Sequence, residues 1–141
     1  MGFLTNEDYK VVCGEDALIV ISQVDAANLL RAEKHAIGEI SSYLFNRYDM
    51  TAAYQKQGEE RSEYLVSMTC DVVLYHLIAA MPRKMGFDIR KERYEHIIDW
   101  LTLAQAGKVG LDVDFKTDEN GNVTGLPSRF NPGEKNNYLP W

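Results

Sequence analysis

Histidine and carboxylate side chains offer this chain its widest choice of chemistry, because they ligate metal ions and transfer protons near neutral pH. The three histidines are His35, His76 and His96. Helical zinc and di-iron sites use ligand patterns such as His-Glu-x-x-His or Glu-x-x-His, and neither pattern occurs. Glu92 and His96 share a helix face, as many ordinary surface pairs do. We therefore predict no metal and no cofactor, and we expect His76 to be a core or near-core histidine with one hydrogen-bond partner.

Motifs for nucleophilic and nucleotide chemistry are missing from the sequence. There is no Gly-x-Ser-x-Gly turn, no phosphate-binding glycine loop and no dinucleotide fingerprint. Cys13 lacks an obvious histidine and acid arrangement, and Cys70 is expected to be a small buried hydrophobe. The carboxylate pairs Glu15-Asp16 and Glu59-Glu60 are typical of solvated helix starts. The sequence predicts a protein that is not an enzyme.

A basic cluster between residues 83 and 93 is the best candidate for a functional surface. Its cations stand out because the net charge of the chain is −6, which argues against general coating of nucleic acid. Cations in the first turn of a helix oppose the helix dipole, so an anion should offset them. The cluster fits a solvated face with local ion pairs, a subunit contact or a surface that faces DNA. Its members are Arg83, Lys84, Arg90, Lys91 and Arg93.

The C-terminal arm is the second candidate surface. The arm is rich in Pro, Gly and Asn, and it carries the aromatic residues Phe130, Tyr138 and Trp141. Burial of such side chains stabilises a tail by up to a few kcal/mol. The arm is therefore expected either to fold back on its own domain or to dock on a neighbouring subunit.

Length and composition predict one globular domain. The chain has 141 residues, of which 45% are hydrophobic and 26% charged, and it can bury a core without disulfides. The acidic N-terminus does not resemble a signal peptide, and the longest apolar run, at 17–21, is too short to span a bilayer. We expect a protein without membrane contact, in a reducing compartment.

The stretch from Glu59 to Met81 is expected to form the central helix. Apolar residues recur every three or four positions, and in the second half they cover most of the helix circumference. Such a helix lies in the middle of its domain. Pro82 ends it, because proline lacks a backbone N–H and disfavours helix at the preceding residue. The inner stripe comprises Leu65, Met68, Thr69, Val72, His76 and Ala79.

Further helices are expected around this centre. Thr5 and Asp25 have side chains that cap helix N-termini. Residues 15–22 fit a short helix or a β-branched strand, and we favour the helix. Asp88 is expected as the N-cap of the last helix, and Gly107 at its C-terminal end. The predicted ranges are 6–12, 15–22, 26–47 and 88–106.

Together these elements predict a mainly α fold: a small bundle of three long helices plus short N-terminal helices. Gly38 lies inside the first long helix, where glycine costs about 1 kcal/mol relative to alanine. We expect it to let a neighbouring helix approach closely. The polar loop 48–58 could hold one extra turn at 52–54.

The chain changes character after Gly107. Residues 108–141 hold four of the ten glycines and three of the four prolines. Residues 111–115 alternate apolar and polar like a strand, and Asn120-Gly121 is a strong hairpin signal. We predict a helical domain at 1–107, followed at 108–141 by a C-terminal β-hairpin and extended arm of the same domain.

Several segments resemble a family of small proteins from Mu-like tailed bacteriophages and prophages, which are encoded among head-morphogenesis genes. The resemblance covers most of the chain, and its most specific part is 85–94. These proteins look like helical head–tail connector, adaptor or head-completion proteins. The segments are Phe3-Leu4-Thr5-x-x-Asp8-Tyr9, Arg31-Ala32, Cys70-Asp71-x-x-Leu74-Tyr75-His76-Leu77, Met85-Gly86-Phe87-Asp88-Ile89-Arg90-Lys91-Glu92-Arg93-Tyr94 and the Asn136-Asn137…Trp141 ending.

The resemblance implies a structural virion protein at the head–tail interface, which resides in the host cytoplasm during assembly. Its implied partners are the portal protein, tail or tail-completion proteins, and copies of itself in a ring, with twelve-fold symmetry expected. DNA would pass through the ring without specific recognition. The alternative is a small helical nucleic-acid-binding or regulatory phage protein that uses the basic cluster from Arg83 to Arg93.

Overall fold

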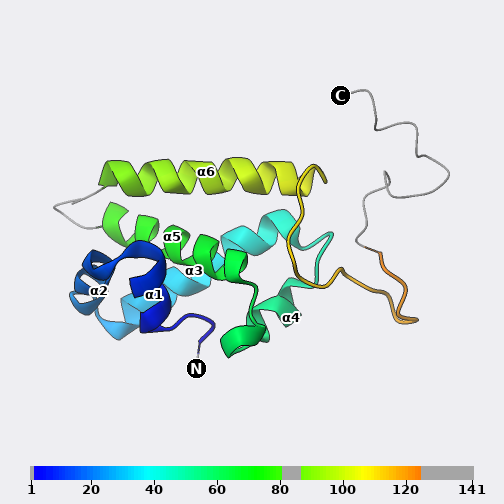
Figure 1. The fold of residues 1–141 in the computed structure, drawn as a ribbon, viewed down its shortest axis with the longest axis horizontal. Helices are drawn as coiled ribbons and strands as arrows, with labels where there is room; N and C mark the ends of the chain where they lie inside the picture. Colours follow the sequence, from blue (N-terminus) through cyan, green and yellow to red (C-terminus); the bar gives the residue numbers. More distant parts are fainter. Residues whose placement is uncertain (1, 81–86, 125–141) are drawn as a thin grey trace.

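The computed structural model describes residues 2–80 and 87–124. Within them the chain is mainly helical, as predicted, and the three long helices form a bundle (Figure 1). Helix α5 runs antiparallel to both α3 and α6. The elements are α1 (Asn6–Cys13), α2 (Glu15–Ser22), α3 (Ala26–Leu44), α4 (Met50–Gln55), the 3₁₀ turn η1 (Gly58–Glu60), α5 (Glu63–Ala79) and α6 (Phe87–Gln105).

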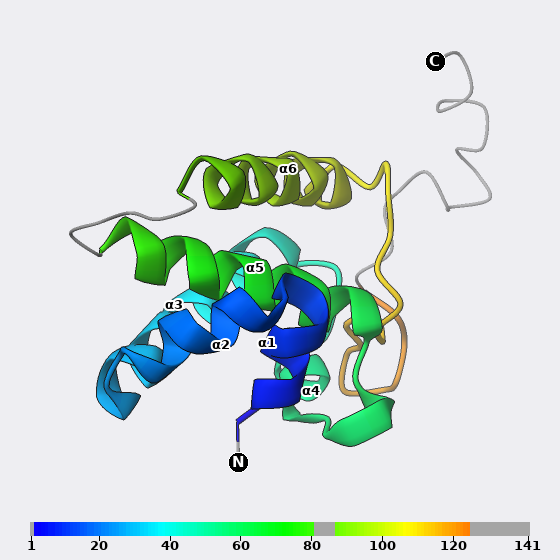
Figure 2. The same cartoon turned by 60° about the vertical axis from the view of Figure 1, so that its left-hand side comes forward.

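Helix α5 is the centre of the molecule, as its apolar circumference predicts. Helix α6 lies along one side of α5, and α1 and α2 cover another (Figures 1 and 2). The α5 helix starts later than predicted, because the Ser62 hydroxyl accepts a hydrogen bond from the Leu65 amide and η1 precedes it. The predicted end of this helix at Met81 and Pro82 lies outside the described residues. The fully buried side chains of α5 include Leu65, Val72, Val73 and Leu74.

The short N-terminal helices confirm their local signals. Thr5 and Asp8 form a capping box, in which each side chain accepts a hydrogen bond from the backbone N–H of the other residue. Residues 15–22 are helical, so the β-branched run does not become a strand. Asp25 caps α3 through the amide of Asn28. The side chains of these helices that are buried in the core are Tyr9, Ala17 and Ile21.

Helix α6 begins one residue earlier and ends one residue earlier than the predicted 88–106, and Gly107 follows its C-terminal end as predicted. Gly107 has φ of +81°, and its N–H donates to the Ala104 carbonyl, while the Lys108 N–H reaches the Leu103 carbonyl. These two bonds make a Schellman motif. The expected N-cap role of Asp88 is wrong, because Phe87 already belongs to the helix and Asp88 lies in its first turn.

The predicted β-hairpin is not supported in the described part of the C-terminal segment. Residues 108–124 contain only isolated bridges, between Tyr48 and Phe115 and between Thr117 and Val123. The chain does turn at 118–122, where Gly121 has φ of +82°. However, Phe115 forms its bridge with Tyr48 and stacks on it, with ring centroids 5.2 Å apart, so the end of the predicted 111–115 strand lies against the segment that follows α3. Among the described residues, no helix is both long and apolar enough to cross a membrane.

Candidate functional site

A buried carboxylate in α5 holds two arginines of the basic cluster. Asp71 is only 5% exposed, although it lies in α5, which is apolar on most sides. Arg93 binds it with two hydrogen bonds, from Nε to Oδ1 at 2.8 Å and from Nη2 to Oδ2 at 2.9 Å. Arg90 adds a weaker contact to Oδ1 at 3.4 Å and donates to the Cys13 carbonyl at 3.3 Å. This Asp71 cluster therefore ties α6 to α5 and to the end of α1.

The Asp71 cluster also changes the properties of its neighbours. The hydrogen bond with Asp71 raises the pKa of Arg93, so this guanidinium stays charged. Burial, with the Asp71 charge acting in the same direction, raises the pKa of Cys13 to about 12. The Cys13 thiol lies 3.5 Å from Asp71 Oδ1 and donates to it. Burial likewise raises the pKa of Cys70. Both thiols therefore stay protonated near neutral pH, which makes them poor nucleophiles.

The predicted interface residues fall into three groups. Arg90 and Arg93 bind Asp71 of their own chain. The Asp71 carboxylate is thus the anion that was expected to offset cations in the first turn of the helix. Lys91 lies between them in the sequence and is exposed. The others lie outside the described residues, and their interface role stays a prediction: Arg83, Lys84, Phe130, Tyr138 and Trp141.

A second ion pair fastens the N-terminus to the turn before α5. Arg61 and Asp8 both have side chains that are 12% exposed, and Arg61 Nη2 donates to Asp8 Oδ1 at 3.1 Å. Arg61 also donates to the carbonyl oxygens of Phe3 and Gly58. Burial on its own would raise the pKa of Asp8, but the hydrogen bonds from Arg61 and Thr5 outweigh it and hold this pKa below the ordinary value of 3.8.

This ion pair predicts a specific loss of stability in acid. Because the pKa of Asp8 is lowered on folding, its contribution is complete above about pH 5 and disappears as pH falls below about 4. Asp8→Asn should lower the free energy of unfolding by about 2 kcal/mol at pH 7. The difference from the unmodified protein should shrink steadily towards pH 2. Chemical denaturation at a series of pH values measures it, with Glu7→Gln, an exposed carboxylate in the same turn, as the control. A difference that is independent of pH would contradict the assignment.

A third polar cluster joins α3 to α5 and α6, and the sequence patterns did not reveal it. His35 and Glu39 lie one turn apart on α3, and His76 of α5 lies beside them. His76 Nε2 is 2.9 Å from Glu39 Oε1, and the Tyr94 hydroxyl donates to Glu39 Oε2. The expected single hydrogen-bond partner of His76 is thus Glu39. The four-residue spacing of His35 and Glu39 was a visible signal, but the third member comes from a helix distant in sequence.

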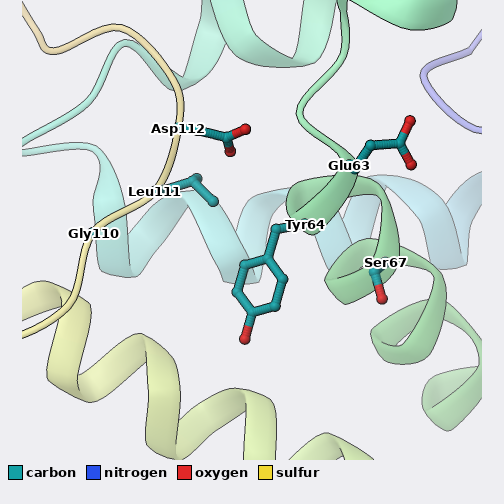
Figure 3. A pocket seen from close by; sticks show the side chains of 6 residues that line it. All are labelled: Glu63, Tyr64, Ser67, Gly110, Leu111 and Asp112. Carbon is teal, nitrogen blue, oxygen red and sulfur yellow. The ribbon is translucent and has the colours of Figure 1, made fainter.

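Two surface clefts lie among the described residues. The first, of about 480 Å³, lies between the start of α5 and residues 110–112 (Figure 3). The ring of Tyr64 lies between Ser67 and Leu111 in this view, and it packs edge-on against Trp100. Two carboxylates, those of Glu63 and Asp112, line the cleft, and Asp112 accepts a hydrogen bond from the Ser62 hydroxyl. The cleft therefore has an aromatic wall and two acidic side chains.

The second cleft has a volume of about 600 Å³. It is bounded by the end of α3, by α4 and by residues 116–117. The Tyr54 hydroxyl in its wall shares a hydrogen bond of 3.0 Å with the buried Thr69. Phe45 is 51% exposed at its edge, with the ammonium of Lys116 5.7 Å from the ring centroid.

Comparison with known protein families identifies the family of this chain. Residues 3–125, most of the chain, match the protein family described as Bacteriophage Mu, Gp36. The chain therefore belongs to this bacteriophage family, and the resemblance to proteins of Mu-like phages is confirmed at that level. None of the curated proteins matches the chain. None of the solved structures matches it either.

Proposed function

We propose that this protein is a structural component of the virion that assembles as a ring-shaped head–tail connector between portal and tail. The family match over residues 3–125 carries the proposal, together with the resemblance of the 85–94 segment to connector proteins. The proposed partners are the portal, tail-completion proteins and further copies of the chain in a ring, expected to be twelve-fold. The proposed role involves no chemical reaction and no cofactor.

Several structural features support this role. A rigid helical body suits a building block, because its three long helices bury one another and leave side chains at their edges for contacts. A closed ring needs a heterologous interface, in which one face of the subunit binds a different face of the next. Lys91 is exposed beside the Asp71 cluster, and exposed acidic residues such as Glu59 and Glu60 offer opposite charge elsewhere on the subunit.

The alternative, a nucleic-acid-binding or regulatory protein, has less support from the geometry. Such a protein would present the basic cluster to phosphate groups. Arg90 and Arg93, two of the five cations, are instead bound to Asp71. Lys91 is the described member of the cluster for which the structure gives no ion pair. An overall charge of −6 also opposes tight, general binding to DNA.

Association with purified portal tests the connector proposal directly. Light scattering at micromolar protein should show several copies bound per portal ring, and Lys91→Glu should weaken this association by about three- to tenfold, the effect of one charge at an interface rim. Lys34→Glu, at an exposed position of α3, is the matched control and should bind normally. Circular dichroism should show that both variants keep their helices.

Two results would oppose the proposal. No association with portal at micromolar concentrations would count against a connector. Tight DNA binding in an electrophoretic shift assay, lost as salt is added and lost in Lys91→Glu, would favour the nucleic-acid alternative.

A further inference from the structure

The side chains of His35, Glu39 and His76 have the composition of a metal site. One ligand atom from each residue lies within 4.8 Å of the other two. Two imidazoles and one carboxylate are the donor set that zinc-class divalent ions prefer, whereas Mg²⁺ and Ca²⁺ prefer oxygen ligands alone. The sequence patterns predicted no metal site, because this set is divided between two helices.

The positions of these atoms need only small movements to hold an ion. Zinc bonds to nitrogen and oxygen of about 2.0–2.1 Å place ligand atoms roughly 3.4 Å apart in a tetrahedral site. His76 Nε2 and Glu39 Oε1 are already 2.9 Å apart, and the rings of His35 and His76 have centroids 4.5 Å apart. His35 is exposed, so a side-chain rotation that moves its ring by about an ångström disturbs few packing contacts.

Neighbouring side chains hold the Glu39 carboxylate in place, as they do for carboxylates that bind metal ions. Ligating carboxylates are normally hydrogen-bonded at the oxygen that the metal does not use, which fixes their orientation. The Tyr94 hydroxyl donates to Glu39 Oε2 in this way. Tyr94 is itself held by stacking on Tyr75, with centroids 4.0 Å apart and planes 7° apart. Glu39 and His76 side chains are 23% and 24% exposed, so an ion could enter from solvent.

We propose that His35, Glu39 and His76 bind one zinc-class divalent ion, which links α3 to α5. Three protein ligands leave a fourth position for water in the isolated subunit. The ion replaces the proton between His76 and Glu39, and it pins together two helices whose packing forms the core. This proposal is independent of the connector role.

Calorimetric titration of tag-free, chelator-stripped full chain with Zn²⁺ tests the site. We expect one ion per chain with a Kd of about 10 µM or tighter, and a rise in Tm of about 8 °C at a hundredfold excess over Kd. Co²⁺ should bind in the same place and show the intense visible absorption of a four- or five-coordinate ion. His35→Ala should weaken binding at least about tenfold, as should Glu39→Gln.

His96→Ala provides the matched control, because His96 is also exposed but lies on α6 outside the set. It should bind Zn²⁺ as the unmodified protein does. His35→Ala is the decisive variant, since an exposed side chain can be removed without loss of the fold. Binding that survives His35→Ala, binding that is lost in His96→Ala, or no binding at about 100 µM Zn²⁺ would each overturn the proposal.

Discussion

Asp71→Asn is expected to lower the free energy of unfolding by about 3 kcal/mol, although the substitution preserves side-chain volume. Asparagine offers one acceptor oxygen in place of two and carries no charge. Arg93 then loses its bidentate partner, and Arg90 loses its anion. Breaking a buried ion pair from one side typically costs 3–5 kcal/mol, and the lower end applies here because the Arg93 side chain is 43% exposed and water solvates it in part.

Chemical denaturation followed by circular dichroism measures this change. The slope of the free energy of unfolding against denaturant concentration should stay the same. Asp99→Asn, an exposed carboxylate on α6, is the control and should shift stability by less than about 0.5 kcal/mol. Arg93→Ala should cost less than Asp71→Asn, because its loss leaves Arg90 beside the carboxylate. If Asp71→Asn and Asp99→Asn were equally stable, the Asp71 cluster would make no net contribution to the free energy of unfolding.

The same geometry alters how the predicted interface can be tested. The direct test of a subunit contact at Arg90 and Arg93 is reversal of both charges. Since both side chains contact Asp71, reversal would place carboxylates against a buried carboxylate and destabilise the fold as well. Lys91 is the better probe, because it is exposed and the substitution leaves the Asp71 cluster intact.

The elements that the sequence predicted well are those set by local interactions. The Thr5 and Asp8 capping box, the Asp25 cap and the positive φ of Gly107 all depend on residues within one or two turns. The central position of α5 follows from composition alone, because a helix that is apolar on most sides has to be buried. Local hydrogen bonds and the spacing of apolar residues along the sequence were therefore enough to predict the helical bundle.

The features that sequence reasoning missed depend on contacts between distant segments. Asp71 lies within an apolar stretch, and only packing shows that arginines of α6 reach it. His76 meets Glu39 across 37 positions of the chain. The Asn120-Gly121 signal did produce a turn, with one isolated bridge between Thr117 and Val123, but Phe115 bridges to the distant Tyr48 and no strand forms in the described residues 108–124.

Two glycines are expected to respond to alanine in opposite directions. Gly107→Ala should lower the free energy of unfolding by about 3 kcal/mol, because alanine at a φ of +81° is strained by about 1–2 kcal/mol and its Cβ would lie 2.3 Å from Arg47 Nη2. Arg47 cannot simply swing away, since it is 9% exposed and its Nε donates to the Ala104 carbonyl.

Gly38→Ala should instead raise stability by about 1 kcal/mol. The expectation that Gly38 admits a neighbouring helix was wrong: it is exposed in α3, and a Cβ there would meet no atom within 4 Å. Thermal and chemical denaturation of both variants measure the contrast. Gly107→Asn separates the two causes, because asparagine tolerates positive φ but is larger than alanine. A milder loss than in Gly107→Ala would assign the cost to backbone strain, and a greater loss would assign it to displacement of Arg47.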